Sequence, residues 1–385
     1  MDNIIYLDYA STTYVDPRVK IEMDKFFSEE YGNPGSNHEI GQKAKNALEN
    51  SREIIAKILN CSTEEIIFTS GGTESINLAL QGVAKALKNK GRHIITTQIE
   101  HPAVIETCKF LEKEGFQITF VAPEKNGIVN PENIKKEIKE NTILVSVMYA
   151  NNEIGTIQPI AAIAKLCREK NIYFHTDACQ AGGILPINVN NLNVDLLTLN
   201  SSKFYGPKGC GILFVRKETK IEPLICGGGQ EQKLRSGTEN IPAIVGFAKA
   251  LEIAEQERKE EFKRLKILRD KLIDGLLKIP NSTLNGDQLQ RLPSNVSIRF
   301  QGIEAEAVLT NLNNLRVCAS TGSACSTKKL EPSHVLSAIG LTPQESKGTI
   351  RFSLGRKTTN EEIDKVINVM PEVVQRLRKL LTEVY

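Results

Sequence analysis

The chain lacks several features by which whole classes of protein are recognised. Its 385 residues carry a net charge of only +3, and the basic residues are spread along the chain, so no nucleic-acid-binding surface is indicated. No run approaches the roughly 18 apolar residues that span a bilayer. The first residues, MDNIIYLDYAS, include acids and no long apolar core, which argues against a signal peptide. We therefore expect a cytoplasmic protein with no direct contact to membrane or nucleic acid.

The chain also lacks the cysteine spacing of a metal or redox centre. It has eight cysteines, but none forms a C-x-x-C pair, so no metal site is predicted. Most lie in apolar runs and are interpreted as small core residues. Cys325 differs, because it lies among small residues in the run ASTGSAC. Such a loop makes a thiol accessible, and Lys328 and Lys329 favour its thiolate. Taken alone, this loop is better explained by an incidental surface thiol.

What is present in the chain is an ordinary globular composition with two kinds of organisation. Hydrophobic residues make up 40% and charged residues 25%, and the length predicts two domains. From Ile66 to Val215, apolar strand-like runs alternate with amphipathic helices, which predicts a mostly parallel, doubly wound α/β sheet. A long helix over 241–277 then leads into a smaller α+β unit. We place the large domain at 16–259 and the small domain at 1–15 and 260–385.

Two neighbouring strands are predicted to end in groups that suit one cofactor. The run 172–176 is followed by Asp177 and Gln180, and the run 194–199 is followed by Asn200, Ser202 and Lys203. Ligands of open α/β sheets bind where the strands end. A lysine can form an imine with pyridoxal phosphate, while a carboxylate keeps the ring nitrogen protonated. An acid and a lysine at strand ends are, by themselves, more often surface charges.

Three further strand ends offer polar groups at the same rim. Gly72 and Thr73 open a helix whose free N–H groups suit a phosphate, although no Gly-Lys-Ser/Thr follows and the segment is not a P-loop. His101 opens the next helix and could stack on a flat ring, whereas a lone His is more often a cap. Asn152 lies in a segment that otherwise reads as a turn. Their convergence with Asp177 is a stronger signal than any one of them.

Two later segments complete the set of candidates. The glycine-rich run 227–240 carries Thr238 and has the composition of an interdomain linker. The strand RFSLGR ends at Arg356, whose guanidinium could bind a substrate carboxylate, although surface ion pairing is the commoner role of such a residue.

The chain resembles the NifS/IscS-type cysteine desulfurases, which belong to the class V aminotransferases and to the fold-type I pyridoxal-phosphate enzymes. The resemblance runs nearly end to end. It rests on the motifs LDYASTT, YGNPGSNH, TSGGTES, EHPAV, NNEIG, HTDACQ, SKFYGPKG, RSGTEN, GSAC and RFSLGR, in this order. It implies a large domain with a mostly parallel seven-stranded sheet and a small α+β domain that carries the cysteine loop.

The resemblance also implies a role for each candidate residue. Lys203 is the Schiff-base lysine and the acid/base at the substrate α-carbon, Cys325 is the nucleophile, and His101 stacks on the ring. The remaining cofactor contacts are Asp177 to the ring nitrogen, Gln180 and Asn152 to the ring oxygen, and Gly72, Thr73, Asn200 and Ser202 to the phosphate. Thr238 reaches the phosphate from a second subunit of a homodimer. Arg356, with Asn33 and Asn152, binds the substrate.

The implied reaction is the removal of sulfur from L-cysteine, which yields L-alanine and a persulfide on Cys325. The sulfur would pass to an acceptor or scaffold protein in iron–sulfur cluster assembly or tRNA thiolation. Two alternatives remain open. One is another fold-type I activity, such as an aminotransferase or selenocysteine lyase. The other is a non-catalytic platform that binds a sulfur-carrying partner.

Three departures from the family pattern bear on these expectations. Many relatives have Ser-x-His-Lys where this chain has Asn200, Ser201, Ser202 and Lys203, so a possible positive charge near the phosphate is lost. Gly35 replaces a serine of the family loop. The chain stops at Tyr385, without the longer tail that some IscS-type enzymes use to dock a scaffold protein.

Overall fold

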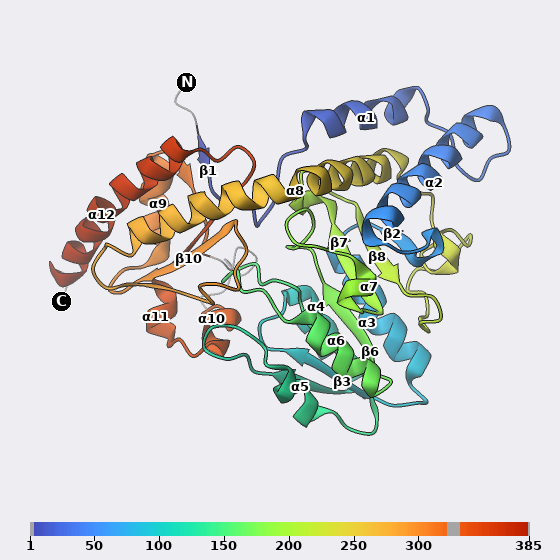
Figure 1. The fold of residues 1–385 in the computed structure, drawn as a ribbon, viewed down its shortest axis with the longest axis horizontal. Coiled ribbons are helices and arrows are strands. Elements are labelled where there is room, and N and C mark those ends of the chain that lie inside the picture. Colours follow the sequence, from blue (N-terminus) through green and yellow to red (C-terminus); the bar gives the residue numbers. More distant parts are fainter. Residues whose placement is uncertain (1–3, 322–331, 384–385) are drawn as a thin grey trace.

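The structure of the chain is a computed structural model that describes residues 4–321 and 332–383. Figure 1 shows a larger sheet-centred unit and a smaller unit at the other end of the molecule. The long helix α8 (Ile241–Leu276) runs across both units and joins them (Figure 1). Within the described residues, every helix is too short or too polar to serve as a bilayer span.

The larger unit is built on a seven-stranded sheet, as the resemblance implied. Its strand order is β2-β8-β7-β6-β5-β3-β4, and β8 alone runs antiparallel to its neighbours β2 and β7. Outside the edge strand β4, nearly every strand residue is buried, because helices cover both faces of the sheet. The strands are β2 (Ile66–Thr69), β3 (His93–Thr97), β4 (Gln117–Val121), β5 (Thr142–Ser146), β6 (Tyr173–Asp177), β7 (Leu196–Asn200) and β8 (Gly211–Val215).

Helices pack on the two faces of this sheet in separate apolar clusters. On one face lie α3 (Gly72–Leu87) and α4 (Pro102–Lys113). The other face is covered by α2 (Glu39–Leu59), α6 (Ile160–Glu169) and the first half of α8. Local sequence sets several helix starts: Asp16 caps α1 (Pro17–Ser28), which begins at Pro17 as predicted. Two short helices, α5 (Pro131–Glu137) and α7 (Val189–Leu192), complete this unit.

The smaller unit forms around an antiparallel sheet. Strand β10 (Asn295–Phe300) lies between β9 (Ser282–Leu284) and β12 (Thr349–Ser353). The N-terminal strand β1 (Ile5–Tyr6) pairs in parallel with β11 (Val317–Cys318). The second half of α8 packs here in one apolar cluster with α9 (Ala305–Asn314) and α12 (Asn360–Glu383). A short helix, α11 (Pro343–Lys347), precedes β12.

One helix near the C-terminal end packs with the larger unit instead. The side chains of Val335, Leu336 and Ile339, in and just after α10 (His334–Ala338), are buried in the same apolar cluster as the central strands. We predicted a large domain of residues 16–259 and a small domain of residues 1–15 and 260–385. That division stays a prediction, since α10 belongs to the second range but shares the core of the larger unit.

A buried ion pair holds the glycine-rich loop against the edge strand β2. The Glu231 carboxylate accepts hydrogen bonds from Arg52 at 2.7 and 3.1 Å and from the Phe68 N–H at 2.7 Å. Three consecutive residues, 231–233, have φ between 45° and 67°, a left-handed conformation that costs energy in non-glycine residues. Contacts made by Glu231 therefore offset local backbone strain.

Replacing Glu231 should strongly destabilise the protein. Glu231→Ala leaves the Arg52 charge buried without its partner and the Phe68 N–H without an acceptor, so stability should fall by about 3–5 kcal/mol. The measurement is the thermal midpoint of the variant. Glu260→Ala is the control, because Glu260 and its partner Lys263 are exposed at 82% and 70%, and removing that pair should change stability by about 0.5 kcal/mol or less. Equal midpoints for the two variants would contradict this account.

Candidate active site

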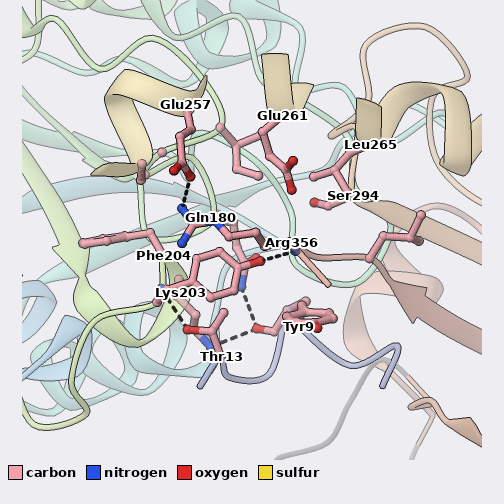
Figure 2. Close-up of a pocket in the computed structure, with 17 residues that line it drawn as sticks. Tyr9, Thr13, Gln180, Lys203, Phe204, Glu257, Glu261, Leu265, Ser294 and Arg356 are labelled. Carbon is pink, nitrogen blue, oxygen red and sulfur yellow. Dashed lines mark hydrogen bonds and ion pairs between the residues drawn. The ribbon is translucent and has the colours of Figure 1, made fainter. Parts of the chain in front are cut away.

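The predicted lysine lies at the end of β7, facing the N-terminal segment of the chain. Lys203 Nζ donates to the carbonyl oxygens of Ala10 at 2.9 Å and Ser11 at 2.6 Å. Gln180 Nε2 donates to the same Ala10 carbonyl at 3.0 Å. Figure 2 shows Lys203 and Gln180 lining one pocket together with Tyr9 and other residues from both units. The ends of the two strands thus lie together, as predicted. They meet at Ala10 and Ser11 of the N-terminal segment, which the sequence analysis did not place at the site.

Asp177 is the last residue of β6, and β6 is the direct neighbour of β7. Asp177 is 6% exposed, and its Oδ1 accepts the N–H of Cys179 at 2.9 Å. The charges of Asp177 and Lys203 both act on the His101 ring, so the three predicted residues share one electrostatic environment.

His101 is held as a neutral ring. It caps α4, and its Nδ1 accepts the N–H of Ala103 at 3.1 Å, so the ring proton resides on Nε2. Burial lowers its pKa, Asp177 opposes that shift, and the charge of Lys203 adds to it. A neutral imidazole with a fixed N–H suits packing against a flat ring and donating one hydrogen bond.

The layer beneath these residues consists of buried polar groups. His175 lies two residues before Asp177 and bridges two neighbouring strands, with Nδ1 2.9 Å from Ser146 Oγ and Nε2 3.0 Å from Thr198 Oγ1. Burial lowers the pKa of His175 to about 4, so the ring is neutral. The Glu100 carboxyl accepts from Thr97 Oγ1 and from the Met148 N–H, and burial raises its pKa to about 8. His175 is therefore uncharged at neutral pH, and Glu100 keeps its proton to a higher pH than an ordinary carboxyl does.

The start of α3 forms a small cradle beside these groups. A Cβ on Gly72 would come within 2.9 Å of Cys179 Sγ and 3.6 Å of Asn200 Cβ, so only glycine fits there. The backbone N–H groups of the first turn, including that of the exposed Thr73, point out of the helix start. Glu74, the acid of this turn, is paired with Arg235 at 2.9 Å, which offsets its negative charge next to the cradle.

Asn200 and Ser202, which depart from the family pattern, are tied to each other and to the N-terminal segment. Asn200 Oδ1 accepts the N–H of Ser202 at 3.4 Å, and the Ser202 carbonyl accepts from both the N–H and the hydroxyl of Thr13. These bonds use the backbone of Ser202 and leave its hydroxyl available to a ligand.

The arginine predicted to bind a carboxylate is already paired within the protein. The Arg356 guanidinium bonds Asp16 at 2.6 Å and Glu257 at 2.8 Å and stacks on the Tyr205 ring at 4.2 Å. Figure 2 shows Arg356 and Glu257 joined above Lys203 and Gln180. Arg356 thus links the start of α1, helix α8 and the loop after β12.

A second arginine, Arg351 on β12, lies beside other site residues and was missed in the sequence analysis. It is 2% exposed, and its guanidinium donates to the Asn152 carbonyl at 3.0 Å, to Asp8 at 2.7 Å and to Ser11 Oγ at 2.8 Å. Its position in the same RFSLGR motif was the available signal. Ser11 connects it to Lys203, since Lys203 Nζ bonds the Ser11 carbonyl.

Two of the predicted residues that the structure describes are not brought to this cluster. Asn33 is exposed in the loop between α1 and α2, where its side chain accepts the N–H of Gly35. Thr238 is exposed in the glycine-rich loop. Cys325 lies outside the described residues.

The residues present fit pyridoxal phosphate. The cradle at Gly72 offers backbone donors for a phosphate, Asp177 offers a buried carboxylate, and Lys203 offers an amine at the adjoining strand end. The neutral ring of His101 shares their environment. Among the residues that the structure describes, no group of three or more His, Cys, Asp or Glu side chains could hold a metal ion.

The fold agrees with comparisons to known proteins. The model of the aminotransferase class-V family matches residues 5–366. The chain is similar to a Methanosarcina thermophila protein named cysteine desulfurase IscS, with 50% identity over 376 residues, 98% of this chain and 93% of the relative. A Dictyoglomus turgidum protein of the same name is 49% identical over 381 residues, 99% and 97% of the two chains. A solved structure described as a NifS-like protein superposes with a TM-score of 0.92 and 40% identity, covering 97% of this chain and 100% of that one.

The buried imidazole of His175 should make stability depend on pH. Its pKa is about 4 in the folded protein and about 6.5 when unfolded. Between these values the unfolded chain binds a proton that the folded chain does not, so stability falls as the pH drops from 6.5 towards 4. Thermal or urea unfolding at several pH values measures the slope.

The matched variant is His175→Gln, which keeps a donor and an acceptor but does not titrate. Its stability should fall by about 1.4 kcal/mol less per pH unit than that of the parent protein in this window. Parallel pH curves for the two proteins would show that His175 is not held neutral.

Proposed function

Because the chain belongs to the aminotransferase class-V family, and within it to the IscS-type cysteine desulfurases, we propose that it removes sulfur from L-cysteine with pyridoxal phosphate as cofactor. The products are L-alanine and a persulfide on Cys325. The observation that carries the proposal is the placement of Asp177 and Lys203 at the ends of adjacent parallel strands, near a neutral His101. An aminotransferase needs no thiol, so the motif around Cys325 favours desulfuration.

When bound, pyridoxal phosphate supplies an electron sink for the substrate α-carbon. Lys203 would hold its aldehyde carbon, Asp177 its ring nitrogen, and Gln180 and Asn152 its ring oxygen. The cradle of Gly72 and Thr73, with Asn200 and Ser202, would hold its phosphate. Thr238 would reach the same phosphate from a second copy of the chain in a homodimer, which accords with its exposure in the glycine-rich loop.

The chain's own groups then move protons and sulfur. The Lys203 amine takes the proton from the substrate α-carbon. The Cys325 thiolate forms a bond to the substrate sulfur, and the carbon–sulfur bond breaks with its electron pair left on carbon, which takes up a proton to give alanine. His101, neutral with its proton on Nε2, donates a hydrogen bond without adding a charge. The persulfide sulfur passes to an acceptor protein in the cytoplasm.

The sequence predicted that Arg356 binds the substrate carboxylate. We prefer Arg351 in this role. Arg356 is paired with two carboxylates and stacked on Tyr205, which commits it to joining the two units. Arg351 is paired with Asp8, and it also contacts the Asn152 carbonyl and Ser11, which in turn contacts Lys203. A carboxylate held by Arg351 therefore keeps the substrate amine near Lys203, while Asn33 remains a candidate from the α1–α2 loop.

The activity itself is tested by product analysis. Purified protein with pyridoxal phosphate, L-cysteine and a reductant should release alanine and sulfide in equal amounts. Cys325→Ala should lose both products and still bind the cofactor, whereas Lys203→Ala should lose the absorbance of the cofactor–lysine linkage as well. Alanine formation that persists in Cys325→Ala would contradict the proposal and favour a lyase reaction that needs no cysteine nucleophile, whereas loss of the substrate amino group without alanine would favour a transaminase.

The two arginines are distinguished by steady-state kinetics. Arg351→Lys keeps a charge but loses the planar two-point contact to a carboxylate, so the KM for L-cysteine should rise about tenfold or more. Arg356→Lys should leave the KM within about twofold and lower the thermal midpoint, because Asp16 and Glu257 lose a shared partner. The reverse pattern of KM values would return the carboxylate contact to Arg356.

A further inference from the structure

A histidine outside the predicted site lies against the loop that carries His101. His334 begins α10, and its Nε2 is 2.9 Å from the main-chain carbonyl oxygen of Glu100. A carbonyl oxygen only accepts hydrogen bonds, so Nε2 of His334 carries a proton and donates it. The bonded carbonyl belongs to the peptide group that joins Glu100 to His101. His334 therefore holds the backbone directly at the predicted cofactor-stacking residue.

The larger unit holds the same loop from other directions. Asn151 Nδ2 donates to the Ile99 carbonyl at 2.8 Å. Glu100 Oε1 accepts from Thr97 Oγ1 at 2.7 Å and from the Met148 N–H at 3.0 Å. The bond from His334 adds a contact at the carbonyl of residue 100, which neither of these groups reaches.

A second hydrogen bond fixes α10 to the neighbouring strand end. Ser333, which caps α10 through the Leu336 N–H, donates its hydroxyl to Glu153 Oε2 at 2.6 Å. Glu153 is 6% exposed and follows Asn152, a predicted cofactor contact. Ser333 and His334, at the start of α10, thus contact the loops that follow β5 and β3.

The apolar side of α10 keeps these polar contacts in place. Val335 and Leu336 are 1% and 2% exposed and pack in the core of the larger unit. The His334 side chain also lies close enough to His101 for its charge to contribute to the lowering of the His101 pKa. The hydrogen bond to the Glu100 carbonyl and the packing of α10 therefore hold His334 next to the backbone of His101.

We infer that His334 is a positioning residue for this enzyme: by holding the Glu100 carbonyl, it fixes the His101 ring against the cofactor. The inference rests on the proposed function, because it takes His101 as the ring-stacking residue. His334 touches neither substrate nor cofactor in this account. It acts through the 100–101 peptide group, and the Ser333–Glu153 bond sets the helix that presents it.

The test compares two substitutions at this position in the full-length protein. His334→Leu removes the donor, and His334→Gln keeps an N–H that can reach the carbonyl. Binding of pyridoxal phosphate is titrated by absorbance, and the absorbance of the bound cofactor is followed against pH. His334→Leu should bind the cofactor about five- to tenfold more weakly and shift the pH curve, while His334→Gln should restore both. Unchanged affinity and pH curve in His334→Leu would overturn the inference.

Leu336→Ala is the matched control for general loosening of α10. It creates a cavity under the helix and lowers the thermal midpoint, but it leaves the His334 donor in place. Its cofactor pH curve should remain that of the parent protein. A shift equal to that of His334→Leu would assign the effect to helix packing and overturn the inference. Failure of the parent protein itself to bind the cofactor would instead overturn the proposed function, so the two failures are distinguishable.

Discussion

The parallel pairing of β6 with β7 is the constraint on which the rest of the site depends. Asp177 is paired with Thr198 in this register, and Lys203 follows the end of β7 after a single turn of 3₁₀ helix. Parallel neighbours must end at the same edge of a sheet, so the acid and the amine cannot separate without breaking the ladder. The N-terminal segment covers this edge. Lys203 and Gln180 donate hydrogen bonds to its Ala10 carbonyl, and its Thr13 hydroxyl donates to the Ser202 carbonyl.

Around this edge the protein uses neutral polar groups where charges would be costly. His175 is bonded between two hydroxyls, His101 gives its Nδ1 lone pair to a helix N–H, and the buried carboxyl of Glu100 has a raised pKa. In a region with little water, an uncompensated charge is expensive, whereas neutral groups keep their hydrogen bonds at modest cost. The charged groups nearby are either assigned to the chemistry, as Asp177 and Lys203 are, or paired within the protein, as Arg351 is with Asp8 and Arg356 is with Asp16 and Glu257.

Much of this arrangement could be predicted from the sequence because it follows from local patterns. Apolar runs that alternate with helices indicated the parallel sheet, and polar residues after each run marked the edge where Asp177, His101 and Lys203 lie. The contacts of Arg351, Glu153 and His334 could not be predicted in this way. Each joins segments roughly 180 to 340 residues apart, and no periodicity or spacing encodes such pairs. The pairing of Arg356 with Asp16 and Glu257 is of the same long-range kind.

The measurement that tests the central claim most directly is chemical trapping of the cofactor. The protein is loaded with pyridoxal phosphate, reduced with borohydride, digested and analysed by mass spectrometry. The account predicts a single modified peptide with the cofactor mass on Lys203. Lys208 is the internal comparison, because its Nζ also reaches the N-terminal segment, at the Thr13 carbonyl 3.2 Å away. Modification of Lys208 or of scattered surface lysines, with Lys203 unmodified, would contradict the assignment of this strand end as the cofactor site.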